Sequence, residues 1–327
     1  MRLGCDEAKL IKLLLRGEYR LHEMQCNEID LVRPDGIRTG AMSLQQSRTE
    51  RFKVGGSGNS KLVAIVVVLS NRSYLTPSEE ISLKHLRHYL AKYDKYLVIP
   101  KDLKFELSDF NIKRVDEKYF GSLEAHTKFL FSSEYYEAYS NYKYILMYHL
   151  DALVFSDDLE RWCEMDFDYI GSPWLKHKDA PYAGNPDYEG KVGNGGFSLR
   201  KVSSFLKIFN SSQYAISPNE YWKKYYANKS ISRRILGLPK NMLMKSRRYN
   251  NVRWELDRWT KSEENFIANR AAHYYPEFKI APWNVAVYFS FECVPRYAYE
   301  LTGRTLPFGS HSRGKYDRAL LEQQLFG

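Results

Sequence analysis

With 327 residues, the chain is long enough to bury one large core and to carry a small appendage. Its 44% hydrophobic and 15% aromatic residues exclude a disordered polypeptide. Its longest apolar run, residues 62–69, is too short to span a bilayer, and its four cysteines lack the CxxC spacing of a zinc site. The formal net charge of +10 comes largely from one segment, residues 221–261, and suggests an anionic partner.

The beginning of the chain is expected to form an accessory region. Residues 1–54 include apolar residues at helical spacing, which predicts a helical accessory region, formed by a helix or a hairpin packed on the main domain. The first ten residues carry acids where a secretory signal needs an apolar run, so we expect a cytoplasmic protein. GGSGNS at 55–60 has the composition of a flexible linker, either natural or engineered. The main domain is then expected to span residues 61–327.

Strand and helix patterns alternate after the linker. Apolar runs predict strands, and helical periodicity predicts helices. In chain order we expect a strand at 62–69, a helix at 77–93, strands at 95–100 and 111–116, a helix at 122–140 and a strand at 142–150. This order predicts an α/β fold with a mostly parallel sheet and helices on both faces. Ligands of such sheets bind at the carboxyl ends of strands, so the loops after residues 69, 100 and 150 are candidate binding regions.

An acid follows the last of these strands. Asp151 lies between the strand at 142–150 and a second short apolar strand at 152–155. A carboxylate at such a junction is costly unless it is hydrogen-bonded or binds a ligand, and both roles remain open for Asp151. Asp157 and Asp158, by contrast, precede LERW and predict a helix N-cap and first turn.

Three later features add candidate site residues. The turn GNGG at 193–196 allows a close approach of the backbone to a ligand. Glu263 and Glu264 open a helical segment, where acids also stabilise the helix N-terminus. His311 is a lone histidine in a turn-rich segment. Each feature has an ordinary structural explanation when it is considered alone.

The basic segment 221–261 contains six lysines and six arginines against two acids, interleaved with tryptophan and tyrosine. Such a segment is either a solvated helical face or a docking surface for nucleic acid, an anionic membrane or phosphate-bearing substrates. No recognised nucleic-acid reader motif occurs, so we expect no nucleic-acid partner. Our hypothesis is that the segment docks the pyrophosphate of a lipid-linked acceptor or the inner membrane surface, which predicts a peripheral membrane association.

In order along the chain, these segments resemble the motifs of GT-A glycosyltransferases: an acid at a strand end, a glycine loop, an acid pair opening a helix, and a late histidine. The chain is more closely similar to a bacterial family of little-characterised GT-A-like proteins associated with surface polysaccharide synthesis, such as O-antigen or capsule. The resemblance covers about residues 62–316, and the residues that carry it lie in 150–174, 193–201, 263–265 and 307–311.

The resemblance implies a GT-A-like (Rossmann-like) hexosyltransferase that moves a sugar from a nucleoside-diphosphate donor, most simply a UDP-sugar, to a hydroxyl of a glycan or lipid-linked glycan. Asp151 resembles the last acid of the DxD motif, which holds Mn²⁺ or Mg²⁺ against the donor diphosphate. Here the triplet is His149-Leu150-Asp151, so the first acid is absent. The implied ligands are Asp151 and His311, with His149 beside them, since Mn²⁺ also accepts imidazole. A metal-independent enzyme that neutralises the diphosphate with basic residues remains an alternative.

The resemblance also implies roles around the donor and acceptor. Glu264 resembles the general base of an inverting enzyme, with Glu263 as the second choice. The expected donor-binding residues are Ser70, Arg72, Lys128, Asn194, Gly195 and Gly196. Trp174 is expected to stack on the acceptor sugar.

A second class of function stays open. A non-catalytic glycan-binding or scaffold protein that kept the GT-A fold would account for the absence of the first DxD acid. Turnover of a donor by the wild-type protein separates the two classes, because a binding protein shows none.

Overall fold

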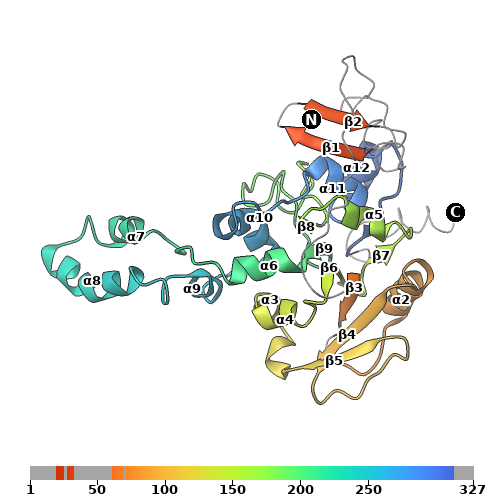
Figure 1. The fold of residues 1–327 in the computed structure, drawn as a ribbon, viewed down its shortest axis with the longest axis horizontal. Coiled ribbons are helices and arrows are strands. Elements are labelled where there is room, and N and C mark those ends of the chain that lie inside the picture. Colours follow the sequence, from red (N-terminus) through yellow and green to blue (C-terminus); the bar gives the residue numbers. More distant parts are fainter. Residues whose placement is uncertain (1–19, 26–27, 33–60, 70, 313–327) are drawn as a thin grey trace, which may run out of the picture.

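The computed structural model of the chain describes residues 20–25, 28–32, 61–69 and 71–312 (Figure 1). A six-stranded sheet forms the centre of the main domain, in the order β5-β4-β3-β6-β9-β8. Its strands are β3 (Lys61–Val68), β4 (Asp94–Pro100), β5 (Asn111–Val115), β6 (Tyr142–Tyr148), β8 (Tyr169–Ile170) and β9 (Phe197–Lys201). β5, β4, β3 and β6 run parallel, whereas β9 is antiparallel to both β6 and β8. The predicted α/β fold with a mostly parallel sheet is confirmed.

Helices cover both faces of this sheet. The helices of the main domain are α2 (Pro77–Tyr89), the 3₁₀ turn η1 (Glu117–Tyr119), α3 (Leu123–Leu130), α4 (Ser133–Glu137), α5 (Leu159–Glu164), α6 (Val202–Phe209), α10 (Glu263–Tyr274), α11 (Trp283–Phe289) and α12 (Pro295–Leu301). On β6, the hydroxyl of Tyr148 donates a hydrogen bond to the carbonyl of Ser82 on α2. The sulfur of the neighbouring Met147 accepts a hydrogen bond from the hydroxyl of Tyr135 on α4. Successive residues of a strand point to opposite faces, so α2 and α4 lie on opposite sides of the sheet.

Two local expectations are corrected at helix termini. The single helix predicted at 122–140 is wrong, because the chain forms α3 and α4 with a break between them. Ser132 starts the second helix, and its hydroxyl accepts a hydrogen bond from the N–H of Tyr135 at 3.1 Å. Asp158 is the N-cap residue of α5, as predicted, but its carboxylate makes no capping bond and instead accepts from the hydroxyl of Ser156 at 2.8 Å.

A smaller sheet adjoins the end of β6. It contains β7 (Leu153–Val154), β10 (Ser290–Phe291) and β11 (Gly309–Ser310), in the order β10-β11-β7. β10 and β11 are parallel, and β7 is antiparallel to β11. This sheet joins the C-terminal part of the described chain to the segment that follows Asp151.

The basic segment forms an arm that projects from the main domain. Its helices are α7 (Pro218–Tyr225), α8 (Ile231–Met244) and α9 (Val252–Leu256). Figure 1 shows α7 and α8 side by side at the far left of the molecule, well away from the central sheet. The chain leaves the body after α6 and returns to it at α10.

Of the N-terminal region, the structure describes two strands, β1 (Arg20–Gln25) and β2 (Glu28–Val32), which pair in antiparallel fashion. These residues are therefore strands and not the predicted helix. The rest of the expected accessory region 1–54, and the linker 55–60, lie outside the described residues. None of the helices in the described ranges combines the length and the hydropathy that crossing a membrane requires.

Candidate active site

The candidate residues meet where the central sheet adjoins the smaller sheet. β6 ends at Tyr148, which is opposite Phe197, the first residue of β9. His149 follows directly, and its backbone N–H donates to the carbonyl of Gly196 at 2.7 Å. The segment after β6 therefore lies against the glycine turn that enters β9.

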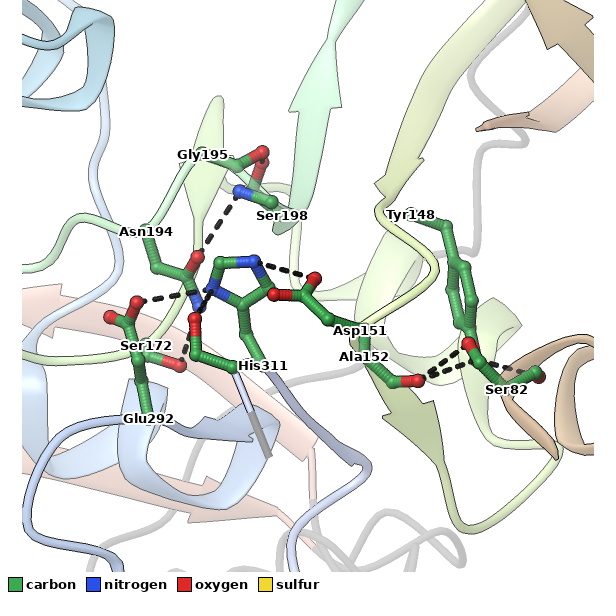
Figure 2. A network of polar contacts seen from close by, with 12 residues as sticks. Ser82, Tyr148, Asp151, Ala152, Ser172, Asn194, Gly195, Ser198, Glu292 and His311 are labelled. Atoms are coloured by element: carbon green, nitrogen blue, oxygen red, sulfur yellow. Dashed lines mark hydrogen bonds and ion pairs between the residues drawn. The ribbon is translucent and has the colours of Figure 1, made fainter. Parts of the chain in front are cut away.

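The smaller sheet adds two side chains from the C-terminal part of the chain. Because β10 and β11 are parallel neighbours, the residues that follow them, Glu292 and His311, lie side by side. β11 also pairs with β7, and this brings His311 next to Asp151. Figure 2 shows the His311 ring between the carboxylates of Asp151 and Glu292.

The His311 ring contacts both acids. Its Nδ1 lies 3.0 Å from Oε1 of Glu292, and its Nε2 lies 3.2 Å from Oδ1 of Asp151. The second contact is an ion pair and not an aligned hydrogen bond. One ligand atom each from His149, Asp151 and His311 lie within 4.8 Å of one another. A fourth member, His126 of α3, places its ring centroid 5.2 Å from that of His149.

Burial and neighbouring charges set the protonation of this cluster. Burial acts to lower the pKa of His311, but Asp151 and Glu292 outweigh it and raise the pKa to about 10. Burial acts to raise the pKa of Asp151, but His311 outweighs it and lowers the pKa to about 2. Burial, followed by the charges of His126 and His311, lowers the pKa of His149 to about 3. The protein groups alone therefore give a protonated His311 between two carboxylates, beside a neutral His149.

These residues fit a divalent cation. The Nε2 atoms of His149 and His311 are buried and have no hydrogen-bond partner among the described residues, which is costly for a polar atom. Two imidazoles and one carboxylate form a ligand set that Mn²⁺ and related ions accept. Glu292 would hold the other ring nitrogen of His311 and so fix the orientation of that ligand.

The glycine turn leaves room for the histidines. A Cβ atom at Gly196 would lie 2.0 Å from Nε2 of His311 and 2.7 Å from Nδ1 of His149. A Cβ atom at Gly195 would lie 2.1 Å from Oε1 of Glu263. Real side chains do not approach this closely, so both positions require glycine while the site keeps its geometry.

Asn194 holds the shape of the turn. It adopts a left-handed conformation with φ of 68°, which Asn tolerates better than most residues. Its Oδ1 accepts from the N–H of Gly196 at 3.1 Å, and its Nδ2 donates to the hydroxyl of Ser172 at 3.0 Å. Both polar atoms of the buried Asn194 side chain thus make a hydrogen bond within the protein, and its predicted contact with a donor stays a prediction.

Glu263 belongs to a buried ion pair. Nη2 of Arg200 on β9 donates to Oε1 of Glu263 at 2.8 Å and to the carbonyl of Gly195 at 3.0 Å. Both side chains are almost completely buried. Burial acts to raise the pKa of Glu263, but Arg200 outweighs it and lowers the pKa to about 2. The pair ties the start of α10 to the glycine turn.

Glu264 lines a pocket that Trp174 also borders. Burial, together with the charge of Glu263, raises the pKa of Glu264 well above its usual range. A Cβ atom at Gly193 would overlap the ring of Trp174, so Trp174 packs directly on the turn. The pocket is lined by Trp174, Pro181, Tyr182, Asn185, Tyr188, Glu264, Glu292 and Cys293. Two acids and three aromatic rings therefore border one cavity, next to the histidine cluster.

Two other predicted donor-binding residues, Arg72 and Lys128, form ion pairs with residues outside this cluster. Arg72 follows β3 and is paired with Glu79 at the start of α2. Lys128 lies on α3 and pairs with Glu124 at 2.6 Å on the exposed side of that helix. Ser70 lies outside the described residues. The donor-binding role of all three stays a prediction.

Three members of the site were not predicted from the sequence. His126 sits on the same helix as the predicted Lys128, but no motif marks it. Glu292 follows a two-residue strand that is too short to recognise. Arg200 lies in the five-residue strand FSLRK, and the sequence does not show that this arginine is buried.

Comparison with protein-family models gives a family. Residues 109–311 match the family model described as "Protein of unknown function (DUF5672)", and the chain belongs to this family. A search of curated proteins gives no match.

Solved structures that resemble this chain include glycosyltransferases, all at low sequence identity. An active-site mutant of LgtC is 12% identical, with 76% of this chain and 86% of that chain covered and a TM-score of 0.39. A glycosyltransferase involved in glycosylation of the major capsid of PBCV-1 is 10% identical, with coverage of 80% and 98% and a TM-score of 0.38. Mouse xyloside xylosyltransferase 1 is 12% identical, with coverage of 77% and 97% and a TM-score of 0.38.

Proposed function

We propose that the protein is a glycosyltransferase of the hexosyltransferase type that transfers a sugar from a nucleoside-diphosphate donor to a hydroxyl acceptor. The observation that carries this proposal is the convergence of four distant segments on one region. Asp151, the turn at 193–196, the acid pair at 263–264 and His311 are joined there by direct contacts or by the shared pocket. A cation site beside an acid in an aromatic pocket suits sugar transfer from a diphosphate, since the cation would neutralise the leaving group and the acid would accept the proton of the attacking hydroxyl.

The donor diphosphate would bind at the histidine cluster. His149, Asp151 and His311 would hold a divalent cation, Mn²⁺ or Mg²⁺, which supplies positive charge against the leaving diphosphate. The rigid turn at 193–196 would place the donor sugar between this cluster and the pocket. Arg72 and Lys128 would contact the nucleotide or diphosphate after rearrangement of their present ion pairs.

Glu264 would act as the general base on the acceptor side. Its carboxyl borders the pocket that contains Trp174, on which an acceptor sugar ring would stack. A hydroxyl bound in this pocket could pass its proton to Glu264 when Glu264 is in its carboxylate form. Glu263 is less suited, because Arg200 engages it. Direct displacement with this base would invert the anomeric centre.

The substrates that we propose follow the resemblance found in the sequence. The donor is a UDP-sugar in the first instance, and the acceptor is a hydroxyl of a glycan or lipid-linked glycan, as in bacterial surface polysaccharide synthesis. The aromatic lining of the pocket supports a sugar acceptor, since flat rings stack on pyranose faces.

Thermal unfolding with a panel of nucleotide-sugars, with and without Mn²⁺, tests the binding part of the proposal. A matching donor at about 100 times its Kd should raise Tm by roughly 5 °C, because it binds only the folded state. The rise should need Mn²⁺ and should disappear in the Asp151→Asn variant. A panel without any shift would contradict the proposal.

A second candidate function is a glycan-binding protein without catalysis. One observation favours it: His149 stands where the DxD motif has its first acid, so the site has one carboxylate ligand where two would be expected. Such a protein would show a thermal shift with glycans and no release of nucleoside diphosphate, in either the wild type or the Glu264→Gln variant.

A further inference from the structure

The arm formed by α7 and α8 exposes a continuous apolar face. Ile231, Ile235, Leu238 and Met242 recur at intervals of three and four residues and so form one stripe along α8. Leu236 and Leu243 widen this stripe on one side. All six side chains are exposed, and Leu236 keeps 79% of its surface accessible. A single helix of a water-facing surface does not normally expose so many large aliphatic residues.

The opposite face of α8 is packed, so the exposed face is not the result of an unformed arm. A Cβ atom at Gly237 would lie 2.3 Å from the ring of Tyr226, which shows how closely α8 and the end of α7 approach. Asn250 is fully buried, and its Nδ2 donates to the carbonyls of Met244 and Ile216. The arm is therefore a built hairpin of helices with one side left apolar.

Positive charge surrounds this face. Residues 221–251 contain nine lysines and arginines and no acid. Eight of the nine are exposed: Lys223, Lys224, Lys229, Arg233, Arg234, Lys245, Arg247 and Arg248. Tyr225, also exposed, adds an aromatic ring of the kind that favours the level of lipid headgroups. An apolar stripe bordered by cations is the pattern of a helix that lies in the interface of an anionic bilayer.

We propose that α8 docks the protein on an anionic phospholipid surface, with its apolar stripe among the acyl chains and its cations on the headgroups. This inference is independent of the proposed sugar transfer. A nucleic acid would use the cations but would leave six aliphatic side chains in water. A second copy of the chain, docked face to face, would bring two uncompensated sets of cations together.

Cosedimentation with vesicles tests the proposal. The wild type should bind vesicles of phosphatidylcholine with phosphatidylglycerol at least about tenfold more tightly than vesicles of phosphatidylcholine alone. Two variants separate the two contributions. Ile235→Ser with Leu236→Ser removes apolar contacts, and Lys245→Gln with Arg247→Gln and Arg248→Gln removes charge. Each should weaken binding to anionic vesicles by roughly tenfold or more.

The matched control changes an equal number of cations elsewhere. Lys84, Lys101 and Lys104 are exposed on the main domain, and their replacement by Gln should leave vesicle binding close to that of the wild type. Circular dichroism and Tm confirm that each variant is folded, which is expected because only exposed side chains change. Three results would overturn the proposal. The serine variant could bind anionic vesicles as tightly as the wild type, or the control variant could lose as much vesicle binding as the other two variants. The wild type could also bind duplex DNA or RNA and not bind vesicles. Self-association that the serine variant removes, without any vesicle binding, would overturn it as well.

Discussion

The Nδ1 atom of His311 lies 3.0 Å from Oε1 of Glu292, while the other nitrogen of the same ring faces Asp151. The two residues follow adjacent parallel strands, β10 and β11, so backbone pairing sets their separation. Glu292 thereby fixes which way the His311 ring points, and His311 in turn offers Nε2 to the centre of the cluster.

The first prediction concerns cation binding. His311→Ala and Asp151→Asn should each weaken Mn²⁺ binding by roughly 100-fold, and Glu292→Gln by about tenfold, because Glu292 acts only by orienting the ring. Isothermal titration calorimetry measures the affinities. His88→Ala is the matched control, since His88 is exposed on α2, and it should bind Mn²⁺ as the wild type does. Equal losses in His88→Ala and His311→Ala would show that the cluster is not the site.

The second prediction concerns the space at Gly196. In Gly196→Ala the new methyl group would lie within 2.0 Å of His311, so the ring must move and Mn²⁺ binding should be lost. Gly184→Ala is the control, because its Cβ atom meets no neighbour within 4 Å. Gly184 has φ of 75°, so the control should lose about 1 kcal/mol of stability through backbone strain and keep its affinity for Mn²⁺. Retained binding in Gly196→Ala would contradict the geometry described.

The third prediction concerns the buried ion pair. Glu263→Leu should lower the free energy of unfolding by about 3–5 kcal/mol, because it leaves Arg200 buried without its carboxylate. The double variant with Arg200→Met should recover much of this loss. Urea denaturation provides the free energies. Glu124→Gln, which breaks the exposed pair with Lys128, should cost about 0.5 kcal/mol or less. If Glu263→Leu and Glu124→Gln lowered the free energy of unfolding by similar amounts, the burial of the Arg200–Glu263 pair would be contradicted.

The fourth prediction is a pH dependence caused by Glu264. Its pKa is raised in the folded protein, so the folded state keeps a proton on Glu264. The unfolded chain releases that proton at about pH 4.3, the usual pKa of Glu. The proton on Glu264 therefore makes its full contribution to the free energy of unfolding below that pH, and the contribution is lost as the pH rises through the folded-state pKa. Glu264→Gln keeps a neutral side chain at every pH, so the Tm difference between the variant and the wild type should grow from pH 4 to pH 8. A difference that stays constant over this range would show that the pKa of Glu264 is not raised.

Much of the fold was predictable from the sequence because the buried strands have long apolar runs. The runs at 62–69 and 142–150 correspond to β3 and β6, and the acids at 263–264 open α10 as expected. The site was predictable only in part. Asp151 and His311 lie 160 positions apart, and their contact depends on β7, β10 and β11, strands of two residues each that carry no periodicity.

The break in the predicted helix at 122–140 has a similar cause. Ser132 offers a cap to the following turn, and this local hydrogen bond ends one helix and begins another within an otherwise helical pattern. The apolar face of α8 was also not expected, because the sequence shows its aliphatic residues but not which of them the rest of the arm covers.

The most direct test of the proposed activity is the release of nucleoside diphosphate from a panel of nucleotide-sugars with Mn²⁺, measured with glycan acceptors and with water alone. The wild type should turn over at least one donor, Asp151→Asn and Glu264→Gln should each be slower by roughly 100-fold, and the distant Lys101→Gln variant should match the wild type. Release from no donor, or equal release by the wild type and both site variants, would contradict the assignment of a sugar-transferring site to this cluster.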